Sequence, residues 1–242
     1  VADLHFAPTL GSKKNLLREA VNEKNIFITG NTVVDAMNHT VEKDYVFEND
    51  ELNKLDYKNK KVIMVTAHRR ENWGKGIENI CTALRRIAEE NEDVEIVYLV
   101  HLNPVVKDVV YNNLNGMKGV HLLPPLDTKE THNLMNKCFM VMADSGGLQE
   151  EAPHLGKPVL VLRDVTERPE AVEAGTVKLV GTDIKKIVDE AYKIMKDEEE
   201  YEKMSKAINP YGDGKASDRI VDAILYHFGV LKDRPDEFSP KK

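Results

Sequence analysis

The sequence predicts an α/β protein in which parallel strands alternate with helices. Between residues 62 and 197, short runs rich in valine, isoleucine and leucine alternate with longer runs whose apolar residues recur every three or four positions. The connecting segments carry glycine, proline and charged residues. Alternation of this kind is typical of a parallel sheet joined by right-handed helical crossovers. Such sheets bind ligands at the carboxyl ends of their strands.

The first forty residues repeat this pattern on a smaller scale. In chain order, the predicted strand, helix, strand and helix lie at 4–7, 12–20, 26–30 and 31–37. So small a piece cannot cover its own sheet edge, and we expect residues 1–40 to be a remnant of an amino-terminal α/β domain. The chain opens with Val1 rather than methionine, so we expect it to be part of a longer protein.

The remaining residues divide into three segments. Residues 41–60 are charged and show no clear core pattern, which favours a linker. Residues 61–207 hold the main domain, with predicted strands at 62–67, 94–100, 120–123, 138–143, 158–162 and 177–180. Its predicted helices lie at 76–91, 104–114, 128–137, 147–155, near 168–174 and at 183–197, the last with Asp183 as N-cap. Residues 208–242 form a loop and a helix at 215–229 that ends near Gly229.

Composition excludes several classes of protein. The chain has 242 residues, 41% of them hydrophobic, which suits one or two globular domains rather than a disordered chain. The net charge of −7 gives no support to nucleic-acid or anionic-membrane binding. No apolar run approaches the roughly 20 residues of a membrane span, and no secretory signal is visible.

Cysteine and histidine usage argues against metal centres and disulfides. Cys81 lies on a predicted helix and Cys138 on a predicted strand, and two isolated cysteines favour a cytoplasmic setting. The eight histidines show no metal-ligand spacing. Neither a Walker loop nor a Gly-x-Gly-x-x-Gly motif is present, so we expect no metal and no cofactor.

The stretch Asp144-Ser145-Gly146-Gly147 is the first candidate binding site. It follows a predicted strand and begins a predicted helix, where main-chain amides bind phosphate well. For the tetrapeptide alone, an ordinary cap and turn is the simpler interpretation. Glu150 and Glu151 follow, and adjacent residues cannot share a helix face. One of them could face solvent while the other accepts hydrogen bonds from sugar hydroxyls.

Polar clusters follow three further strands. "TAHRRENWG" places His68, Arg69, Arg70 and Glu71 after one strand, where histidine can hold phosphate or move a proton and arginine can bind phosphate. His101 follows the next strand in "VHLNP", where a structural role is an equal alternative. "RDVTERPEAVEAGT" places Arg168 near the same edge, with a solvated charged loop as the alternative.

These motifs together resemble one family. "TAHRREN", "VHLNP", "DSGGLQEEAPHLGKPVLVLRDVTERPEAVEAGT", "LVGTD" and "NPYGDG" resemble the non-hydrolysing UDP-N-acetylglucosamine 2-epimerases. The resemblance covers nearly the whole chain and is most specific over residues 143–176. It implies a Rossmann-like parallel sheet domain within a two-domain, glycosyltransferase-B-like fold, with residues 208–242 returning toward the amino-terminal domain.

The resemblance also implies roles for individual residues. In such a site Ser145, Gly146 and Gly147 hold the diphosphate and Glu151 the ribose. His68 is the catalytic residue, and Arg168 also reaches the substrate. Leu126 makes a main-chain contact in the uracil region, where Thr131 stands in place of an aromatic residue found in many relatives. Arg69 and His101 resemble residues of a second, activating UDP-N-acetylglucosamine site.

The implied activity is that of a cytoplasmic isomerase of polysaccharide biosynthesis. It interconverts UDP-N-acetylglucosamine and UDP-N-acetylmannosamine by eliminating UDP and adding it back. The full-length protein is expected to be a homodimer. The family's acidic catalytic residues lie in the amino-terminal domain, so the fragment alone is expected to be inactive. A UDP-sugar transferase of the same architecture and a non-catalytic UDP-sugar-binding half are the open alternatives.

Overall fold

The computed structural model describes residues 2–240, which divide into two compact units. Unit 1 comprises the residues up to Thr40 together with those from Ile208 onward, and unit 2 comprises Val41–Ala207. The candidate site residues from the sequence all lie in unit 2.

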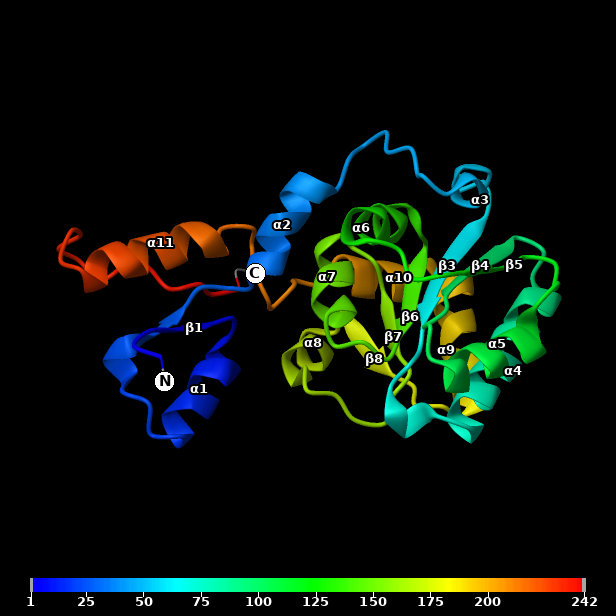
Figure 1. Cartoon of the computed structure of the whole chain (residues 1–242), viewed down its shortest axis with the longest axis horizontal. Helices are drawn as coiled ribbons and strands as arrows, with labels where there is room; N and C mark the ends of the chain where they lie inside the picture. The colour runs from blue at the N-terminus through cyan, green and yellow to red at the C-terminus, as the bar shows by residue number, and fades with distance from the viewer. Residues whose placement is uncertain (1, 241–242) are drawn as a thin grey trace. The chain divides into compact units, whose positions relative to one another are not determined.

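Unit 1 is built on a parallel pair of strands, β1 (His5–Ala7) and β2 (Ile26–Ile28). Its other elements are α1 (Leu10–Arg18), η1 (Glu23–Asn25), α2 (Thr32–Thr40) and α11 (Ala216–His227). The side chain of Asp35 on α2 accepts hydrogen bonds from the main-chain amides of Ala216 and Ser217. These bonds satisfy amides of the first turn of α11. Figure 1 shows the chain from blue at its amino-terminal end to red at its carboxy-terminal end.

Unit 2 contains a parallel sheet of six strands with the spatial order β5-β4-β3-β6-β7-β8. The strands are β3 (Lys61–Thr66), β4 (Val94–Leu99), β5 (Val120–Leu123), β6 (Met140–Ala143), β7 (Val159–Val161) and β8 (Val177–Leu179). Counted from β3, this is the strand order 3-2-1-4-5-6 of a Rossmann sheet, and the predicted α/β class is confirmed. The order reverses between β3 and β6, so a ligand is expected at the carboxyl ends of these two strands.

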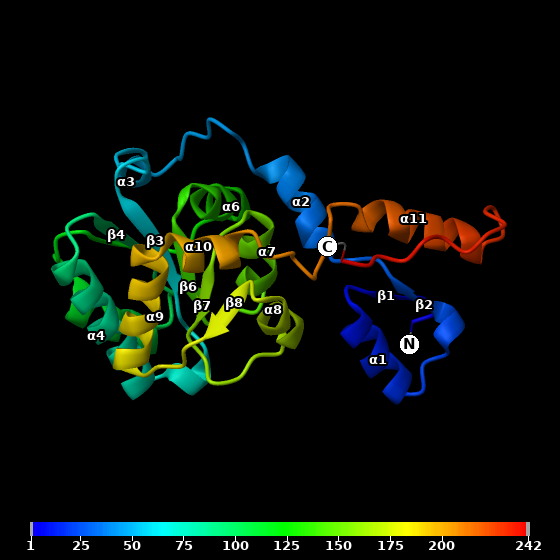
Figure 2. The same cartoon turned by 180° about the vertical axis from the view of Figure 1, so that it is seen from behind.

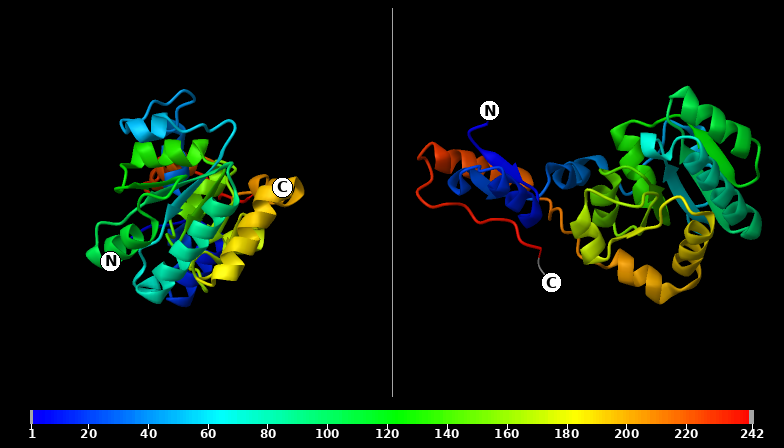
Figure 3. Two further views of the ribbon diagram at one scale, coloured as in Figure 1. Left: turned by 90° about the vertical axis from the view of Figure 1, so that its right-hand side faces the viewer. Right: turned by 90° about the horizontal axis from the view of Figure 1, so that it is seen from below.

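Helices cover both faces of this sheet. One face packs on α4 (Lys75–Glu90), α5 (Pro104–Leu114) and α9 (Ile184–Lys196), and a buried apolar core fills the space between them. In Figure 3, α4 and α9 lie side by side on this face. On the other face lie α6 (Thr128–Lys137), α7 (Leu148–His154) and α8 (Pro169–Ala174), as the reverse view in Figure 2 also shows.

Three details differ from the sequence-based expectation. Residues 41–60 are not a featureless linker: they contain α3 (Asp50–Asn53), and Phe47 and Leu52 are buried in unit 2. Two apolar side chains among so many charges were too few to reveal a core pattern. Cys138 lies at the end of α6, because strand β6 begins only at Met140. The structure also contains two elements that the sequence did not predict: α10 (Glu198–Ser205), which is mostly acidic and exposed, and the short η2 (Arg70–Asn72).

None of the helices found between residues 2 and 240 has the length and apolarity of a membrane span. Within the same residues, no group of three or more histidine, cysteine or acidic side chains could hold a metal ion.

Candidate nucleotide-binding site

The candidate site begins with Asp144, the first residue after β6. Its side chain is fully buried, and its Oδ2 accepts hydrogen bonds from the amides of His68 and Arg69, both at 2.8 Å. The Nδ2 group of Asn72 donates to the same oxygen and to the carbonyl of Leu162, each at 3.0 Å. Asp144 and Asn72 therefore tie together the segments that follow β3, β6 and β7.

His68 is held at the same edge of the sheet. Its ring stacks on that of His101, which follows β4, with the ring centroids 5.1 Å apart. The indole Nε1 of Trp73 donates to the His68 carbonyl at 3.1 Å. Burial lowers the pKa of His68, and His101 and Arg69 lower it further, although the carboxylate of Asp144 opposes them. The imidazole is therefore neutral near neutral pH.

The turn Ser145-Gly146-Gly147 offers main-chain donors. The amides of Gly146 and Gly147 form no hydrogen bond with any of the residues that the structure describes. A Cβ atom placed on Gly146 would lie 3.8 Å from the guanidinium of Arg168 and 3.9 Å from that of Arg69. A turn with unpaired amides that two guanidinium groups approach is suited to an anion, because backbone amides and arginine are the usual ligands of phosphate.

The adjacent glutamates reach in different directions, and neither is free in solvent. Glu150 is 3% exposed and accepts a hydrogen bond from Nε of Arg168. Oε2 of Glu151 lies 3.3 Å from Nε2 of His132, which is buried on α6. A Cβ atom on Gly147 would lie 2.9 Å from Oε1 of Glu151, so this carboxylate bends back over the turn. The expectation that one of the pair faces solvent is not met, because each has a cationic or polar partner.

A chain of polar contacts holds the loop that carries Arg168. Nε2 of Gln149 donates to the Ser145 carbonyl at 3.1 Å, and its Oε1 accepts from the hydroxyl of Thr166 at 2.6 Å. The same hydroxyl accepts the amide of Arg168 at 3.0 Å. Gln149 is fully buried, so it links the turn after β6 to the loop after β7 with little freedom.

Arg163 connects the two loops that carry the candidate arginines. It is 5% exposed and forms ion pairs with Glu71, near Arg69, and with Glu167, next to Arg168. Hydrogen bonds from Arg163 lower the pKa of Glu167 to about 2, and both glutamates raise the pKa of Arg163. This ion-pair bridge fixes the two loops relative to each other.

The structure thus brings most predicted site residues to one edge of the sheet. His68, Arg69, His101, Arg168 and the turn at residues 145–147 lie there, with Glu151 folded over the turn. Leu126 is half-buried in the loop between β5 and α6, and Thr131 is half-buried on α6. Thr131 directly precedes His132, the partner of Glu151.

Asp144 lies in the first candidate stretch, but the sequence did not predict that it holds the site together, and it did not point to Asn72, Gln149, His132 or Arg163. The position of Asp144 directly after a strand was a usable signal, because a carboxylate there commonly accepts amides of a neighbouring loop. The contacts of the other four join distant segments, for which the sequence gives no local signal.

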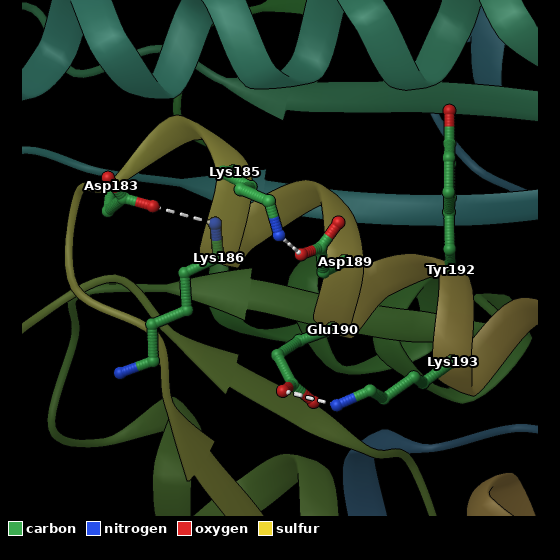
Figure 4. A pocket seen from close by; sticks show the side chains of 7 residues that line it. All are labelled: Asp183, Lys185, Lys186, Asp189, Glu190, Tyr192 and Lys193. Atoms are coloured by element: carbon green, nitrogen blue, oxygen red, sulfur yellow. Dashed lines mark hydrogen bonds and ion pairs between the residues drawn. The ribbon is translucent and has the colours of Figure 1, made fainter.

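A hollow on another part of unit 2 has different chemistry. It is about 660 Å³ and lies along α9, and Figure 4 shows the side chains that line it: Asp183, Lys185, Lys186, Asp189, Glu190, Tyr192 and Lys193. Four of its charges form two ion pairs, Lys185 with Asp189 at 2.5 Å and Lys193 with Glu190 at 2.9 Å, and Asp183 accepts the main-chain amide of Lys186. We assign no ligand to it.

Comparison with known proteins agrees with this geometry. The family model described as UDP-N-acetylglucosamine 2-epimerase matches residues 1–225. A Bacillus subtilis relative named UDP-N-acetylglucosamine 2-epimerase is 52% identical over 241 residues, which cover 100% of this chain and 62% of the relative. The chain therefore spans less than two thirds of that relative's length.

Two solved structures are similar over almost the whole chain. A Staphylococcus aureus structure, described as a co-structure of MnaA with UDP, is 46% identical with a TM-score of 0.92, and the match covers 98% of this chain and 64% of that one. The UDP-GlcNAc 2-epimerase of Neisseria meningitidis bound to UDP-GlcNAc is 44% identical with a TM-score of 0.86, and the match covers 93% and 62% of the two chains. The glycosyltransferase-B-like fold class is confirmed by this likeness. The chain belongs to the UDP-N-acetylglucosamine 2-epimerase family.

Proposed function

We propose that the whole protein interconverts UDP-N-acetylglucosamine and UDP-N-acetylmannosamine by inverting carbon 2 of the sugar. Unit 2 holds the UDP part of the substrate at the carboxyl ends of β3 and β6. The observation that carries this proposal is the turn at residues 145–147, which has two unpaired amides and which the guanidinium groups of Arg69 and Arg168 approach at Gly146. Relatives solved with UDP and with UDP-GlcNAc support the choice of ligand.

The diphosphate occupies this turn in the proposed complex. Its oxygens accept from the amides of Gly146 and Gly147, from the Ser145 hydroxyl and from Arg168. Nε of Arg168 donates to the Glu150 carboxylate and Nη1 to the Glu167 carbonyl, while Nη2 lies 3.8 Å from where a Cβ atom of Gly146 would be, next to the proposed diphosphate position. Arginine suits this role because its planar group can bind one partner through Nε and another through its terminal nitrogens.

Glu151 binds the ribose hydroxyls and the uracil lies toward α6. Oε1 of Glu151 lies beside the turn that receives the diphosphate, 2.9 Å from where a Cβ atom of Gly147 would be, and a carboxylate next to a phosphate site is suited to accept hydrogen bonds from ribose hydroxyls. Leu126 contributes a main-chain contact to the base. Thr131 supplies a small side chain there, so the base packs on less apolar surface than an aromatic residue would give.

The chemistry that unit 2 contributes is stabilisation of the leaving diphosphate. The proposed route removes the proton from carbon 2, releases UDP to leave a 2-acetamidoglucal, and then adds UDP and a proton back, the proton on the opposite face. Charge builds on the diphosphate as the bond to the sugar breaks. Preorganised donors at Ser145, His68 and Arg168 are each expected to contribute about 3 kcal/mol to stabilising that charge. The carboxylates that move the proton are expected in the part of the relatives that this chain does not span.

Arg69 and His101 are proposed to border a second UDP-N-acetylglucosamine. Both lie beside the first site, since Arg69 approaches Gly146 and His101 stacks on His68. A ligand bound there would touch the groups that hold the first one.

We also propose a cytoplasmic homodimer for the whole protein. Cys81 and Cys138 are free and buried, which fits a reducing compartment. The mass of the full-length protein in solution, measured by light scattering, tests the dimer.

The experiment that tests the activity follows deuterium. Full-length protein is incubated with UDP-N-acetylglucosamine in D₂O and the products are followed by NMR. We expect UDP-N-acetylmannosamine with deuterium at carbon 2. Product that keeps the original hydrogen would exclude elimination, and irreversible release of UDP with transfer of the sugar to an acceptor would indicate a transferase instead.

A further inference from the structure

His132 is a buried polar residue whose contact leads directly to the ribose-binding candidate. It lies on α6, is 2% exposed, and its Nε2 is 3.3 Å from Oε2 of Glu151 on α7. Polar side chains this deeply buried require partners, because an unpaired group costs free energy in an apolar environment. The contact is therefore one that folding maintains.

The second oxygen of Glu151 is also confined. A Cβ atom built on Gly147 would lie 2.9 Å from Oε1 of Glu151 and 4.0 Å from Oγ of Ser145. Oε1 consequently faces the turn while Oε2 faces α6. A glutamate side chain loses considerable rotamer freedom when it is fixed in this way. The contact with His132 is what limits that freedom on the side away from the turn.

We propose that His132 is a positioning residue that makes the site selective for ribose over deoxyribose. It holds Oε2 of Glu151, so that the carboxylate presents Oε1 to the ribose hydroxyls rather than sampling several directions. The proposal rests on the proposed function, which assigns the ribose to Glu151. Loss of the contact leaves Glu151 charged and present but no longer directed, so selectivity declines more than general affinity.

The chain provides a matched control in His121. This histidine also pairs with a glutamate, since its Nε2 lies 2.8 Å from Oε2 of Glu95. Both residues lie near the starts of their strands, β5 and β4, whereas the candidate site lies at the carboxyl ends. Changing His121 removes a similar pair without approaching the nucleotide.

The experiment measures affinities for UDP and 2′-deoxy-UDP by calorimetry. The proteins are the unaltered chain, His132→Asn, His132→Gln and His121→Asn, each checked for folding by thermal unfolding. Glutamine places an amide nitrogen close to the position of the imidazole Nε2, and asparagine does not reach it. His132→Met, an apolar substitute of similar volume, replaces His132→Asn if the latter does not fold.

The unaltered chain and His121→Asn are expected to prefer UDP by roughly ten- to hundredfold, the worth of a hydrogen bond to a charged group. His132→Gln retains most of this preference. His132→Asn and His132→Met reduce it to about threefold or less, while affinity for 2′-deoxy-UDP changes little. Full preference in His132→Asn, or in His132→Met where it replaces His132→Asn, would overturn the proposal.

Glu151→Gln distinguishes failure of the role of His132 from failure of the proposed function. If the unaltered chain prefers UDP, and Glu151→Gln removes that preference while His132→Asn does not, the role of His132 fails and the proposed function stands. If the unaltered chain binds neither nucleotide, or binds both equally, the assignment of Glu151 to the ribose is itself wrong and the role of His132 fails with it.

Discussion

The imidazole of His68 lies beside the carboxylate of Asp144, with Nδ1 of the ring 3.6 Å from Oδ1. The other oxygen of Asp144 accepts the main-chain amides of His68 and Arg69. Because 3.6 Å exceeds hydrogen-bonding distance, Oδ1 has no hydrogen-bond partner among residues 2–240. The buried carboxylate of Asp144 therefore fixes the loop that follows β3 and also raises the pKa of the His68 ring against the effect of burial.

Replacing Asp144 by Asn is expected to lower the pKa of His68 further below its ordinary value of 6.5. Burial already lowers it, and the Asp144 charge is the one group that raises it. NMR titration of the ring measures this, with His121 in the same protein as the internal reference. A rise in the pKa of His68 in this variant would contradict the electrostatic account.

The same shift gives the sign of a stability effect. Since His68 binds a proton less readily in the folded chain than in the unfolded one, its contribution is fully present above pH 6.5 and is lost as the pH falls below that value. The free energy of unfolding should therefore fall on acidification in this range. His68→Gln should show a weaker dependence on pH there.

Gly147→Ala is expected to separate stability from binding. Gly147 has φ −61° and ψ −45°, so alanine adopts its backbone without strain and the free energy of unfolding changes by about 1 kcal/mol or less. The new Cβ, however, displaces Oε1 of Glu151, which lies 2.9 Å away. UDP affinity should fall about tenfold, the loss of one hydrogen bond to a charged group. Unchanged affinity would mean that this carboxylate does not contact the ligand.

Glu150→Gln should weaken UDP binding although Glu150 itself does not touch the ligand. The buried Glu150 carboxylate anchors Arg168, which is one-third exposed. Loss of the charge is expected to cost about 1 kcal/mol of stability, since the exposed part of Arg168 is screened by solvent. Calorimetry with UDP checks the binding. Glu173→Gln, on the exposed face of α8, removes the same charge and should leave both quantities unchanged.

Glu167→Gln should reduce the loss of stability at low pH. Arg163 lowers the pKa of Glu167 from 4.5 to about 2, so this ion pair stabilises the fold above pH 4.5 and is lost as the pH falls through about 2. The variant should show a flatter dependence of the unfolding free energy on pH in that window. Denaturant titrations at several pH values measure the slope, and an unchanged slope would contradict the role of the pair.

The 242-residue chain alone is expected to bind UDP weakly and to turn over no UDP-N-acetylglucosamine. The groups proposed to hold UDP are all in unit 2, whereas the proton-moving carboxylates are expected elsewhere. Calorimetry with UDP and an NMR assay of epimerisation test the two parts separately. Turnover by the purified chain would show that it carries its own proton-transfer groups.

The order of helices and strands could be predicted from the sequence because the spacing of apolar residues follows which side chains are buried. The apolar spacing of α4 and the runs in β3 and β4 were recognised within about two residues, the usual scatter of helix and strand ends. Residues 41–60 and α10 were not recognised, because few of their side chains are apolar and their stability comes from packing on the rest of unit 2.

From the sequence, only those site residues could be predicted that lie together in one short segment at the end of a strand. The glycine turn after β6 and the histidine after β3 stand at strand ends, so topology alone brings them together. That adjacent glutamates must diverge was also clear. The partners of those glutamates, Arg168 and His132, lie on other segments, and only the folded arrangement reveals them.

Asn72 ties the loop after β3 to the ends of two neighbouring strands, β6 and β7. Its single amide nitrogen bonds both the Asp144 carboxylate and the Leu162 carbonyl. The loop therefore cannot open without releasing neighbouring strand ends as well. Hydrogen exchange at the amides of His68 and Arg69 should be as slow as in the sheet, and the cost of ordering this loop is met during folding rather than on encounter with a ligand.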